Sequence, residues 1–383
     1  MSGAPLQDRG IAALHEVRAL TALGLMSGTS LDGVDAALLV TDGEHILERG
    51  AWASFPYAVA FRERLRGLLG REQRPGDEAV VRDLTLLHAE AVARLLDQAG
   101  LAASDVDVIG FHGQTVMHRP EIRLTRQIGD GRRLAVETGV PVVEDFRSAD
   151  VATGGHGAPL APLYHLALAE RLERPLAVLN IGGVANVTWM GADEGSGAPP
   201  VLAFDTGTGN ALIDDWVRQT TGRAWDEGGR IAAVGRIDDH RLRPWLDDPY
   251  FRAAPPKSLD RDHFAGVLAT LHGMDAADGA ATLAAFTVRA VQAALAHMPE
   301  PPRRWLVCGG GRHNGVLMAM LADAVAAPVD PVEAVGWNGD ALEAQAFAFL
   351  AVRSLQSRPL SLPTTTGVPR PLTGGTLRLP SMS

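Results

Sequence analysis

Residues 23–40 read LGLMSGTSLDGVDAALLV, which is an apolar run, a glycine-rich turn and a second apolar run. This pattern predicts two strands joined by a turn, in which Gly28 and Gly33 let the backbone bend tightly and approach a ligand closely. The same plan returns in the second half of the chain, where residues 175–190 read PLAVLNIGGVANVTWM. We therefore expect two related halves, which resemble each other in the order of strands and glycine turns more than in residue identity.

Other predicted elements surround these two turns. In the first half we expect a strand at 46–54, helices at about 57–71 and 79–99, and a buried strand in VDVIGFHG at 106–113. In the second half we expect a strand that runs into a helix at 201–217, a strand, glycine loop and helix at 305–324, and a closing helix at 341–355. Strands and helices in this order predict an α/β fold with mixed sheets.

The length indicates two domains, because the chain has 383 residues and single hydrophobic cores stop growing at about 250–300 residues. We expect an N-terminal extension at 1–20, followed by two lobes with a ligand-binding cleft between them. The first lobe takes residues 21–175 and 361–383. The second lobe takes residues 176–360 and carries a helical insertion at about 221–302.

Charge and composition argue against several classes of protein. The formal charge is −10 and the sequence has no run of Lys and Arg, which argues against nucleic acid as a partner. No apolar run approaches the ~18 residues of a membrane span, so we expect a cytoplasmic protein without membrane contact. Cys308 is the only cysteine, which excludes an intramolecular disulfide and the usual thiolate metal sites. The sequence leaves a homodimer open.

Of the 35 Lys and Arg residues, only Lys257 is a lysine. A P-loop requires Gly-Lys-Ser/Thr and a protein kinase requires a strand lysine, and Lys257 lies in Pro-Pro-Lys-Ser, which fits neither. A phosphate site in this chain would therefore use backbone amides and hydroxyl groups. Lys257 either survived by chance or uses its compact ammonium against a carboxylate or a phosphate.

Three glycine-rich loops are candidates for such a site. In residues 28–33 successive amides can form an anion-binding concavity, or the loop is a plain hairpin turn whose side chains bond to their own backbone. In residues 205–210 a strand-end carboxylate, Asp205, precedes a helix N-terminus, which suits either a base beside a phosphoryl group or a helix cap. In residues 309–311 three glycines either leave room for a flat ligand such as an adenosine or form a connector.

Polar side chains also gather in the first half of the chain. His112, Gln114, Thr115 and Arg147 follow the ends of predicted strands, where ligands of open α/β sheets usually bind. This mixture suits hydrogen bonding to a polar substrate such as a sugar. A metal site at His112, His118 and His156 is disfavoured, because their spacing matches no known ligand set.

Together and in this order, the motifs resemble those of the 1,6-anhydro-N-acetylmuramic acid kinases, which belong to the superfamily of acetate and sugar kinases, actin and heat-shock chaperone ATPases. The matching stretches are GLMSGTSLDGVD (24–35), FHGQT (111–115), VEDFRSADVATGGHGAPLAP (143–162), LNIGGVANVT (179–188), FDTGTGN (204–210), PPKS (255–258), CGGG (308–311) followed by Asn314, and ALEAQAFAFLA (341–351). The resemblance implies a two-lobed ribonuclease H-like fold, as in actin-like ATPases.

The resemblance also implies roles for single residues. Asp205 falls where the family has its catalytic base. The residues implied to contact ATP and its phosphates are Gly28, Thr29, Ser30, Leu31, Asp32, Gly33, Val34, Asp35, Gly207, Gly209, Asn210, Gly309, Gly310, Gly311 and Asn314. Those implied to contact the sugar are His112, Gln114, Thr115, Arg147, Asp150 and Glu343. Mg²⁺ would arrive with ATP, with Asp32 as its candidate protein contact. The chain departs from the family at Thr208, where the family often has proline, and at residues 259–261, which read LDR after PPKS.

The implied activity is an ATP-dependent kinase reaction in peptidoglycan recycling. Asp205 would take a proton from water, the water would attack C1 and open the 1,6-anhydro bond, and O6 would receive the γ-phosphoryl group of ATP. The product would be N-acetylmuramic acid 6-phosphate. General-base catalysis of this kind typically contributes ~10²–10⁴-fold. The alternatives are a kinase of the same superfamily for another amino sugar or a small carboxylate, and a non-catalytic nucleotide-switched ATPase.

Overall fold

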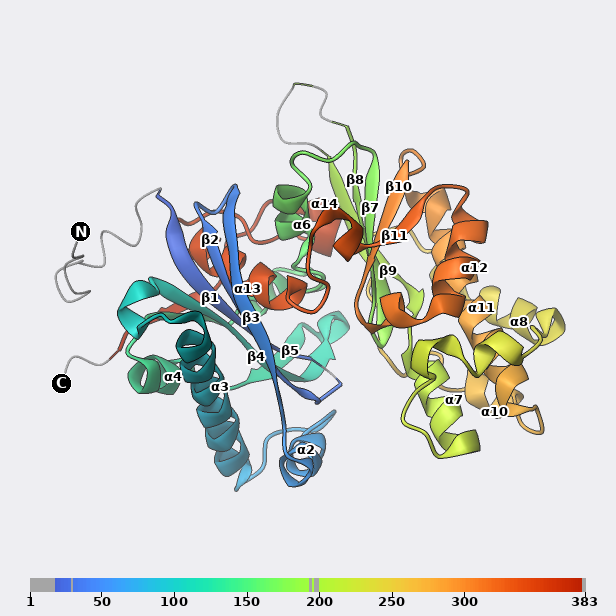
Figure 1. Cartoon of the computed structure of the whole chain (residues 1–383), viewed down its shortest axis with the longest axis horizontal. Coiled ribbons are helices and arrows are strands. Elements are labelled where there is room, and N and C mark those ends of the chain that lie inside the picture. The colour runs from blue at the N-terminus through green and yellow to red at the C-terminus, as the bar shows by residue number, and fades with distance from the viewer. Residues whose placement is uncertain (1–17, 29, 193–194, 196–199, 381–383) are drawn as a thin grey trace. The chain divides into compact units, whose positions relative to one another are not determined.

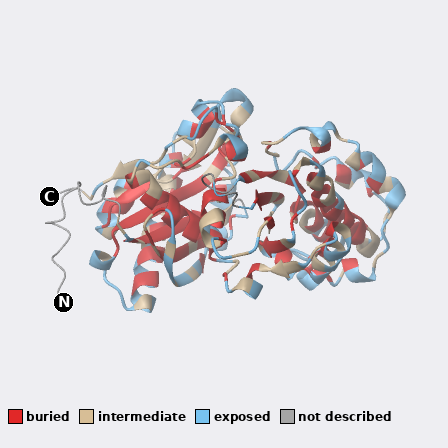
Figure 2. Cartoon of the chain, turned by 90° about the horizontal axis from the view of Figure 1, so that it is seen from above, coloured by how far each residue is buried: buried red, intermediate tan, exposed pale blue. Residues whose placement is uncertain are grey.

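The computed structural model describes residues 18–28, 30–192, 195 and 200–380. Of the expected N-terminal extension, residues 1–17 lie outside the described residues. The chain divides into two compact units, residues 1–170 with 340–383 (unit 1) and residues 171–339 (unit 2). Each unit has its own buried interior, which is red in Figure 2.

Unit 1 is built on a seven-stranded sheet with the order β12-β6-β4-β1-β2-β3, and β5 pairs with β4 outside this path. Its strands are β1 Leu20–Ser27, β2 Gly33–Thr41, β3 Ile46–Pro56, β4 Val108–Arg119, β5 Leu124–Ile128, β6 Val142–Glu144 and β12 Thr376–Arg378. Its helices are α2 Val59–Arg66, α3 Asp77–Ala99, α4 Gly131–Thr138, α5 Ser148–Ala152, α6 Pro162–Leu168, α13 Leu342–Leu355 and α14 Pro363–Thr366, with the short 3₁₀ turns η2 Ala103–Asp105 and η3 Pro120–Ile122 (Figure 1).

The two faces of this sheet are covered in different ways. Leu23 and Leu25 point to one face, where they join the core that α3 and α4 complete. Gly24, between them in β1, faces α13, and a Cβ there would stand 1.7 Å from Ala344 O. Gly110 in β4 meets the same helix. Glycine at these positions therefore lets the helix backbone pack directly on the strands.

Unit 2 contains a five-stranded sheet with the order β11-β10-β7-β8-β9. Its strands are β7 Leu176–Ile181, β8 Val184–Met190, β9 Val201–Thr208, β10 Arg304–Cys308 and β11 Val329–Pro331. Its helices are α7 Ala211–Thr221, α8 Asp239–Leu246, α9 Pro249–Arg252, α10 Val267–Thr270, α11 Ala276–Ala294 and α12 Gly315–Val325, with the 3₁₀ turns η4 Glu227–Gly229, η5 Ala232–Val234, η6 Leu295–His297, η7 Gly310–His313 and η8 Val332–Val335. The expected helical insertion corresponds to α8, α9, α10 and α11.

The two sheets repeat one arrangement. In each, three consecutive strands form an antiparallel meander, β1-β2-β3 in unit 1 and β7-β8-β9 in unit 2. In each, the first strand of the meander also pairs in parallel with a later strand, β4 or β10, which pairs in parallel with β6 or β11. The α/β fold with mixed sheets is confirmed, and the repeated strand order agrees with the repeated sequence pattern.

One helix passes a length and composition test for a membrane span. Among the described residues it is Ala276–His297, and 72% of the apolar window within it is buried inside the protein. Leu283, Phe286 and Val291 of this helix belong to the core of unit 2. Its apolar character is therefore accounted for by packing against the sheet and α7 and α12.

Helix α13 and the C-terminal segment belong to unit 1. The expected boundary at residue 360 therefore differs from this division, which falls at 339/340, because α13 packs on β1 and β4 through the gaps at Gly24 and Gly110. Beyond α13, Leu372 N donates to Ser361 O over 3.0 Å. Strand β12 then pairs antiparallel with β6, so the tail closes this edge of the sheet.

Candidate functional site

The first glycine loop, residues 28–33, joins β1 to β2 in unit 1. Leu31 N and Gln114 Nε2 both donate to Gly28 O, over 3.2 and 3.1 Å. Leu31 is buried with a φ of 58°, and a Cβ at Gly33 would stand 2.4 Å from Phe55 O. The loop is therefore held in one shape by its neighbours. Thr29, one of the predicted ATP contacts, lies outside the described residues.

The side chains of Ser30, Asp32 and Val34 in this loop differ in their exposure to solvent. Ser30 and Asp32 are exposed, and Ser30 Oγ donates to Asp32 Oδ1 over 2.8 Å. Val34 is buried in the core of unit 1. Any ligand contact of Val34 would therefore come from its backbone, whereas Ser30 and Asp32 have side chains available to solvent.

A buried hydrogen-bonded group supports the loop from below. Ser27 Oγ donates to Gln114 Oε1 over 2.6 Å and lies 2.9 Å from Tyr57 Oη. Tyr57 N donates to Asp32 O over 2.9 Å, so Tyr57 contacts the loop from both its backbone and its side chain. Burial raises the pKa of Tyr57 above its usual range, which keeps the hydroxyl neutral. Tyr57 was absent from the sequence-based prediction, because no motif marks it.

Carboxyl groups gather beside this loop. The pKa of Asp35 is raised to about 6, mainly by burial and also by the charges of Asp32, Glu343 and Asp340, although a hydrogen bond from Ser54 acts in the opposite direction. Glu343 is exposed in the first turn of α13. Carboxylates suit Mg²⁺, but among the described residues no group of three or more His, Cys, Asp or Glu side chains could hold a metal ion.

The polar residues of FHGQT lie inside a strand, which corrects the prediction that they follow its end. Strand β4 continues to Arg119 because, after Gly113 with a φ of 70°, it pairs with β5. Arg147 follows β6, as predicted, and its Nε donates to His112 Nε2 over 2.9 Å. Burial, then the charge of Arg147, holds the pKa of His112 well below its usual value, so the ring is neutral and accepts this bond.

Thr115 and Asp150 make contacts of two kinds. Thr115 is partly exposed, and its Oγ1 accepts from Gln127 Nε2 over 3.1 Å. Asp150 is buried, with Oδ1 accepting from Gly157 N and Oδ2 accepting from Thr366 Oγ1, both over 2.6 Å. Asp150 thus ties the GGHGAP loop to the C-terminal segment, and its predicted sugar contact stays a prediction. Gln127 joins this group without any sequence signal that marked it.

The second glycine loop, residues 205–210, begins inside β9 of unit 2. Asn186 pairs with Asp205 and Ala185 pairs with Gly207, so Thr206 is an extra residue in a β-bulge. Asp205 is therefore not at the strand end, which corrects the sequence prediction. The N-cap of α7 is Asn210, which excludes Asp205 as its cap. Asn210 N donates to Gly182 O over 2.7 Å, which joins this loop to the glycine turn after β7.

Residues 250–259 form hydrogen bonds with Asp205. Its N donates to Lys257 O over 3.0 Å, its O accepts from Tyr250 Oη over 2.6 Å, and its Oδ2 accepts from Leu259 N over 2.7 Å. Gly207 and Gly209 follow where space is short, since a Cβ at Gly209 would stand 2.3 Å from Gly182 O. The carboxylate is therefore presented at a defined place by a segment some 50 residues away in sequence.

The third glycine loop follows β10. A Cβ at Gly309 would stand 2.3 Å from Asn180 Oδ1, and one at Gly311 would stand 2.4 Å from Ile181 Cγ2. An added Cβ at Gly310 would stand 3.7 Å from Asn210 Nδ2, an ordinary van der Waals distance, so among these three glycines Gly310 alone has room for a side-chain atom. Asn314 Oδ1 caps α12 by accepting from Val316 N and Leu317 N. Its predicted ATP contact stays a prediction.

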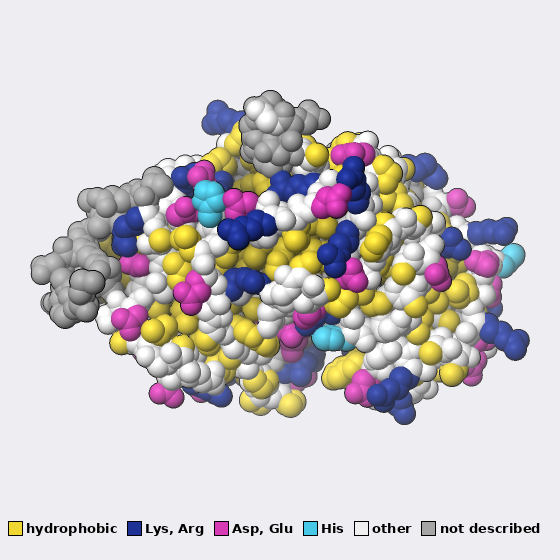
Figure 3. Space-filling view, turned by 45° about the horizontal axis from the view of Figure 1, so that its top comes forward, with side chains coloured by type: hydrophobic (Ala, Val, Ile, Leu, Met, Phe, Trp, Pro, Cys, Tyr) yellow, Lys and Arg dark blue, Asp and Glu magenta, His cyan; other side chains and the backbone are white. Residues whose placement is uncertain are grey.

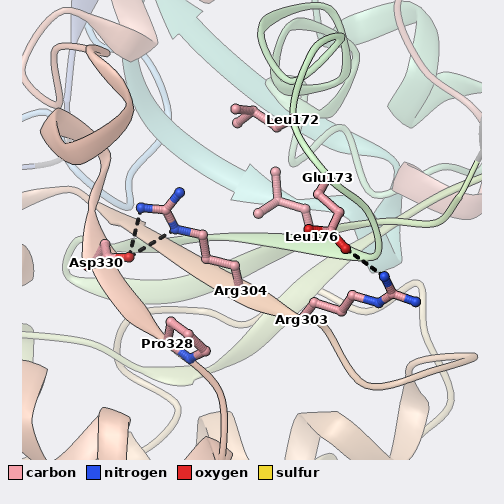
Figure 4. Close-up of a pocket in the computed structure, with 7 residues that line it drawn as sticks. All are labelled: Leu172, Glu173, Leu176, Arg303, Arg304, Pro328 and Asp330. Carbon is pink, nitrogen blue, oxygen red and sulfur yellow. Dashed lines mark hydrogen bonds and ion pairs between the residues drawn. The ribbon is translucent and has the colours of Figure 1, made fainter.

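A cavity of about 380 Å³ lies at the end of the unit 2 sheet where strands β7 and β10 begin (Figure 4). Arg304 and Leu176 begin β10 and β7, whereas the glycine loops follow the carboxyl ends of the same strands. Arg303 pairs with Glu173 and Arg304 pairs with Asp330, so both cations in the cavity wall are neutralised. Ligands of such sheets bind at the carboxyl ends, which directs attention to the glycine loops.

Basic and acidic side chains are mixed on one face of the protein. On the face drawn in Figure 3, Lys and Arg side chains lie among acidic and apolar side chains instead of forming a continuous basic surface. This face therefore carries charges of both signs.

Comparisons with known proteins cover nearly the whole chain. Residues 20–379 match the family described as anhydro-N-acetylmuramic acid kinase. Curated relatives of that name are 57% identical in Rhodospirillum rubrum, over 94% of this chain and 94% of the relative, and 57% identical in Acidiphilium cryptum, over 94% and 98%. Among solved structures, component A of the (R)-2-hydroxyglutaryl-CoA dehydratase of Acidaminococcus fermentans has a TM-score of 0.46 and 12% identity, over 87% of this chain and 99% of that chain.

Proposed function

The chain belongs to the anhydro-N-acetylmuramic acid kinase family, and we propose that it uses ATP and water to convert anhydro-N-acetylmuramic acid into N-acetylmuramic acid 6-phosphate, a step of peptidoglycan recycling. A kinase activity and the use of ATP follow from that membership. The observation that carries the assignment of residues is the anchoring of Asp205 at its N, O and Oδ2 atoms.

Asp205 serves as the general base in this proposal. Its carboxylate takes one proton from a water molecule, and the hydroxide oxygen forms a bond to C1 of the sugar. The bond between C1 and O6 breaks, and O6 forms a bond to the γ-phosphorus of ATP while ADP leaves. A base must be held within hydrogen-bond reach of the proton that it takes, and the three bonds on Asp205 supply that restraint.

The glycine loops bind the nucleotide in this proposal. The loop at residues 28–33 offers backbone amides and the hydroxyl of Ser30 to phosphate oxygens, and the loop of Gly309, Gly310 and Gly311 contacts the adenosine. Asp32 would be the protein contact of a Mg²⁺ ion bound with ATP, and that ion would supply positive charge to the phosphates. Phosphoryl transfer depends mainly on positioning and charge stabilisation, so a P-loop lysine is not required.

Arg147, Thr115 and Glu343 are the proposed sugar contacts with side chains at least partly accessible to solvent. His112 fixes Arg147 by accepting from its Nε, and Gly157 O accepts from its Nη1 over 2.5 Å. A guanidinium held at two of its nitrogens keeps a defined orientation toward a carboxylate or hydroxyl group of a sugar.

The test is a panel of phosphate acceptors. Coupled ADP release is measured with anhydro-N-acetylmuramic acid, N-acetylmuramic acid, N-acetylglucosamine and acetate, and the phosphate is located on the product by NMR. We expect turnover with the anhydro sugar and phosphate on O6. Preferred turnover with another amino sugar or with acetate would assign a different acceptor, and ATP hydrolysis indifferent to every acceptor would favour a nucleotide-switched ATPase.

A further inference from the structure

Lys257 is nearly excluded from solvent, with 7% of its surface exposed. Its Nζ donates to Tyr250 O over 2.8 Å and to Phe251 O over 3.4 Å, and it lies 4.6 Å from the centre of the Tyr250 ring. His297 Nε2 also contacts Phe251 O, over 2.8 Å. The ammonium therefore holds backbone carbonyls and an aromatic face inside unit 2.

The carbonyls that Lys257 holds belong to α9, Pro249–Arg252. The last carbonyls of a helix have no partner within the helix, and a cation near them is favoured. Burial lowers the pKa of Lys257 to about 8, and three N–H donors remain suited to two adjacent carbonyls. A planar guanidinium is a poorer match for this compact space, although arginine supplies the other 34 basic side chains of the chain.

The residues that Lys257 organises are those that hold Asp205. Tyr250, which gives its carbonyl to Nζ, gives its hydroxyl to Asp205 O. The backbone carbonyl of Lys257 accepts from Asp205 N, and Leu259, two residues on, donates its N–H to Asp205 Oδ2. Phe204, directly before Asp205, lies 5.7 Å from Nζ. The Lys257 side chain thus binds the turn that carries Tyr250, and its own backbone binds Asp205 directly.

We propose that Lys257 is a positioning residue, whose ammonium fixes the turn at Tyr250 and Phe251 and thereby sets the place of the Asp205 carboxylate. This inference rests on the proposed function, because it needs Asp205 to act in the reaction. In this inference the Lys257 ammonium positions the base. It does not bind phosphate, and its retention is not a matter of chance. The expected consequence of losing the ammonium is a lower kcat with little change in KM.

The test compares Lys257→Met, which keeps the chain length without the charge, with Tyr250→Phe, which removes only the hydroxyl. Arg252→Met is the matched control, because Arg252 is an exposed cation on the same helix. Turnover, KM for ATP and for the sugar, and the melting temperature are measured for each. We expect kcat to fall at least tenfold in Lys257→Met and a few-fold in Tyr250→Phe, with each KM within threefold and the control within twofold of the parent.

The double variant sharpens the test. Since both side chains act through Asp205, Lys257→Met with Tyr250→Phe is expected to lose little more kcat than Lys257→Met alone. Unchanged kcat in folded Lys257→Met, or a raised KM for ATP with kcat retained, overturns the inference. If Lys257→Met fails to fold, Tyr250→Phe decides by the same criterion. Absence of sugar phosphorylation by the parent would instead refute the proposed function itself.

Discussion

Replacing Gln114 with leucine separates two roles of this side chain. The family resemblance implies a sugar contact for Gln114, whereas in the structure its amide contacts Ser27 and the loop at residues 28–33, which is the proposed phosphate site. Its Nε2 donates to Gly28 O over 3.1 Å and its Oε1 accepts from Ser27 Oγ over 2.6 Å. Leucine has a similar size, and Gln114 is fully buried, so the substitution removes polar contacts with little change in packing.

The size of the effect follows from these two bonds. Each is worth about 1 kcal/mol net, so the loop loses about 2 kcal/mol of the free energy that keeps it in its binding shape. We expect the loop of the variant to lose this shape, so that ATP must restore it on binding, which weakens ATP binding about 30-fold. Ser27→Ala is the matched variant, because it removes the bond to Oε1 and keeps the bond to Gly28 O. We expect it to weaken ATP binding about fivefold.

Calorimetry with a non-hydrolysable ATP analogue measures this loss, and a separate titration with the sugar gives the comparison. Sugar affinity is expected to stay within threefold of the parent in both variants. If Gln114→Leu weakens sugar binding while ATP binding is unchanged, the assignment of this amide to the phosphate loop is refuted and the sugar contact stands.

Three further outcomes are expected. Asp205→Asn should lower turnover by at least ~100-fold while calorimetry finds ATP binding within threefold of the parent, and activity within tenfold of the parent would remove Asp205 as the base. Gly24→Ala should destabilise unit 1 by several kcal/mol, to be read from urea unfolding, because its Cβ would stand 1.7 Å from Ala344 O; parental stability would contradict this packing. Burial lowers the pKa of His88 to about 4, so the unfolded chain binds a proton first as pH falls through 6.5, and stability present above pH 6.5 is lost toward pH 4. The loss between pH 7 and pH 5 should be about 2 kcal/mol, and His88→Leu should lose that much less over the same interval in urea titrations.

Much of the fold could be predicted from local patterns. Apolar runs with glycine-rich ends located β1, β2, β7, β9 and β10, because strand burial and tight turns leave their signature within about ten residues. The length of β4 could not be predicted in this way. Its extension to Arg119 depends on pairing with β5 after the irregular Gly113, which no residue within the FHGQT motif indicates.

The candidate site likewise contains residues that sequence motifs indicated and residues that they did not. The motifs indicated the proposed site residues Asp205 and Thr115 and also Ser27, since these residues stand in or next to recognisable glycine-containing motifs. Tyr250, Gln127 and Tyr57, which contact these three residues, carried no signal. The role of a buried hydroxyl or amide can be recognised only from its hydrogen-bond partner. The partners of these three residues lie 12 to 45 positions away in the sequence.

By itself, the sequence determined that this chain has two repeated α/β halves and a family resemblance over nearly its whole length, and it predicted a phosphate site of amides and hydroxyl groups without a P-loop lysine. Only the tertiary structure decided that α13 packs with unit 1, that Asp205 lies in a bulge held by residues 250–259, and that the single lysine is buried beneath them. The physical reason is how far apart in the sequence the interacting residues lie. Turns and periodic burial are encoded by neighbouring residues, whereas a close backbone approach or a buried ammonium depends on segments that meet only when the chain folds.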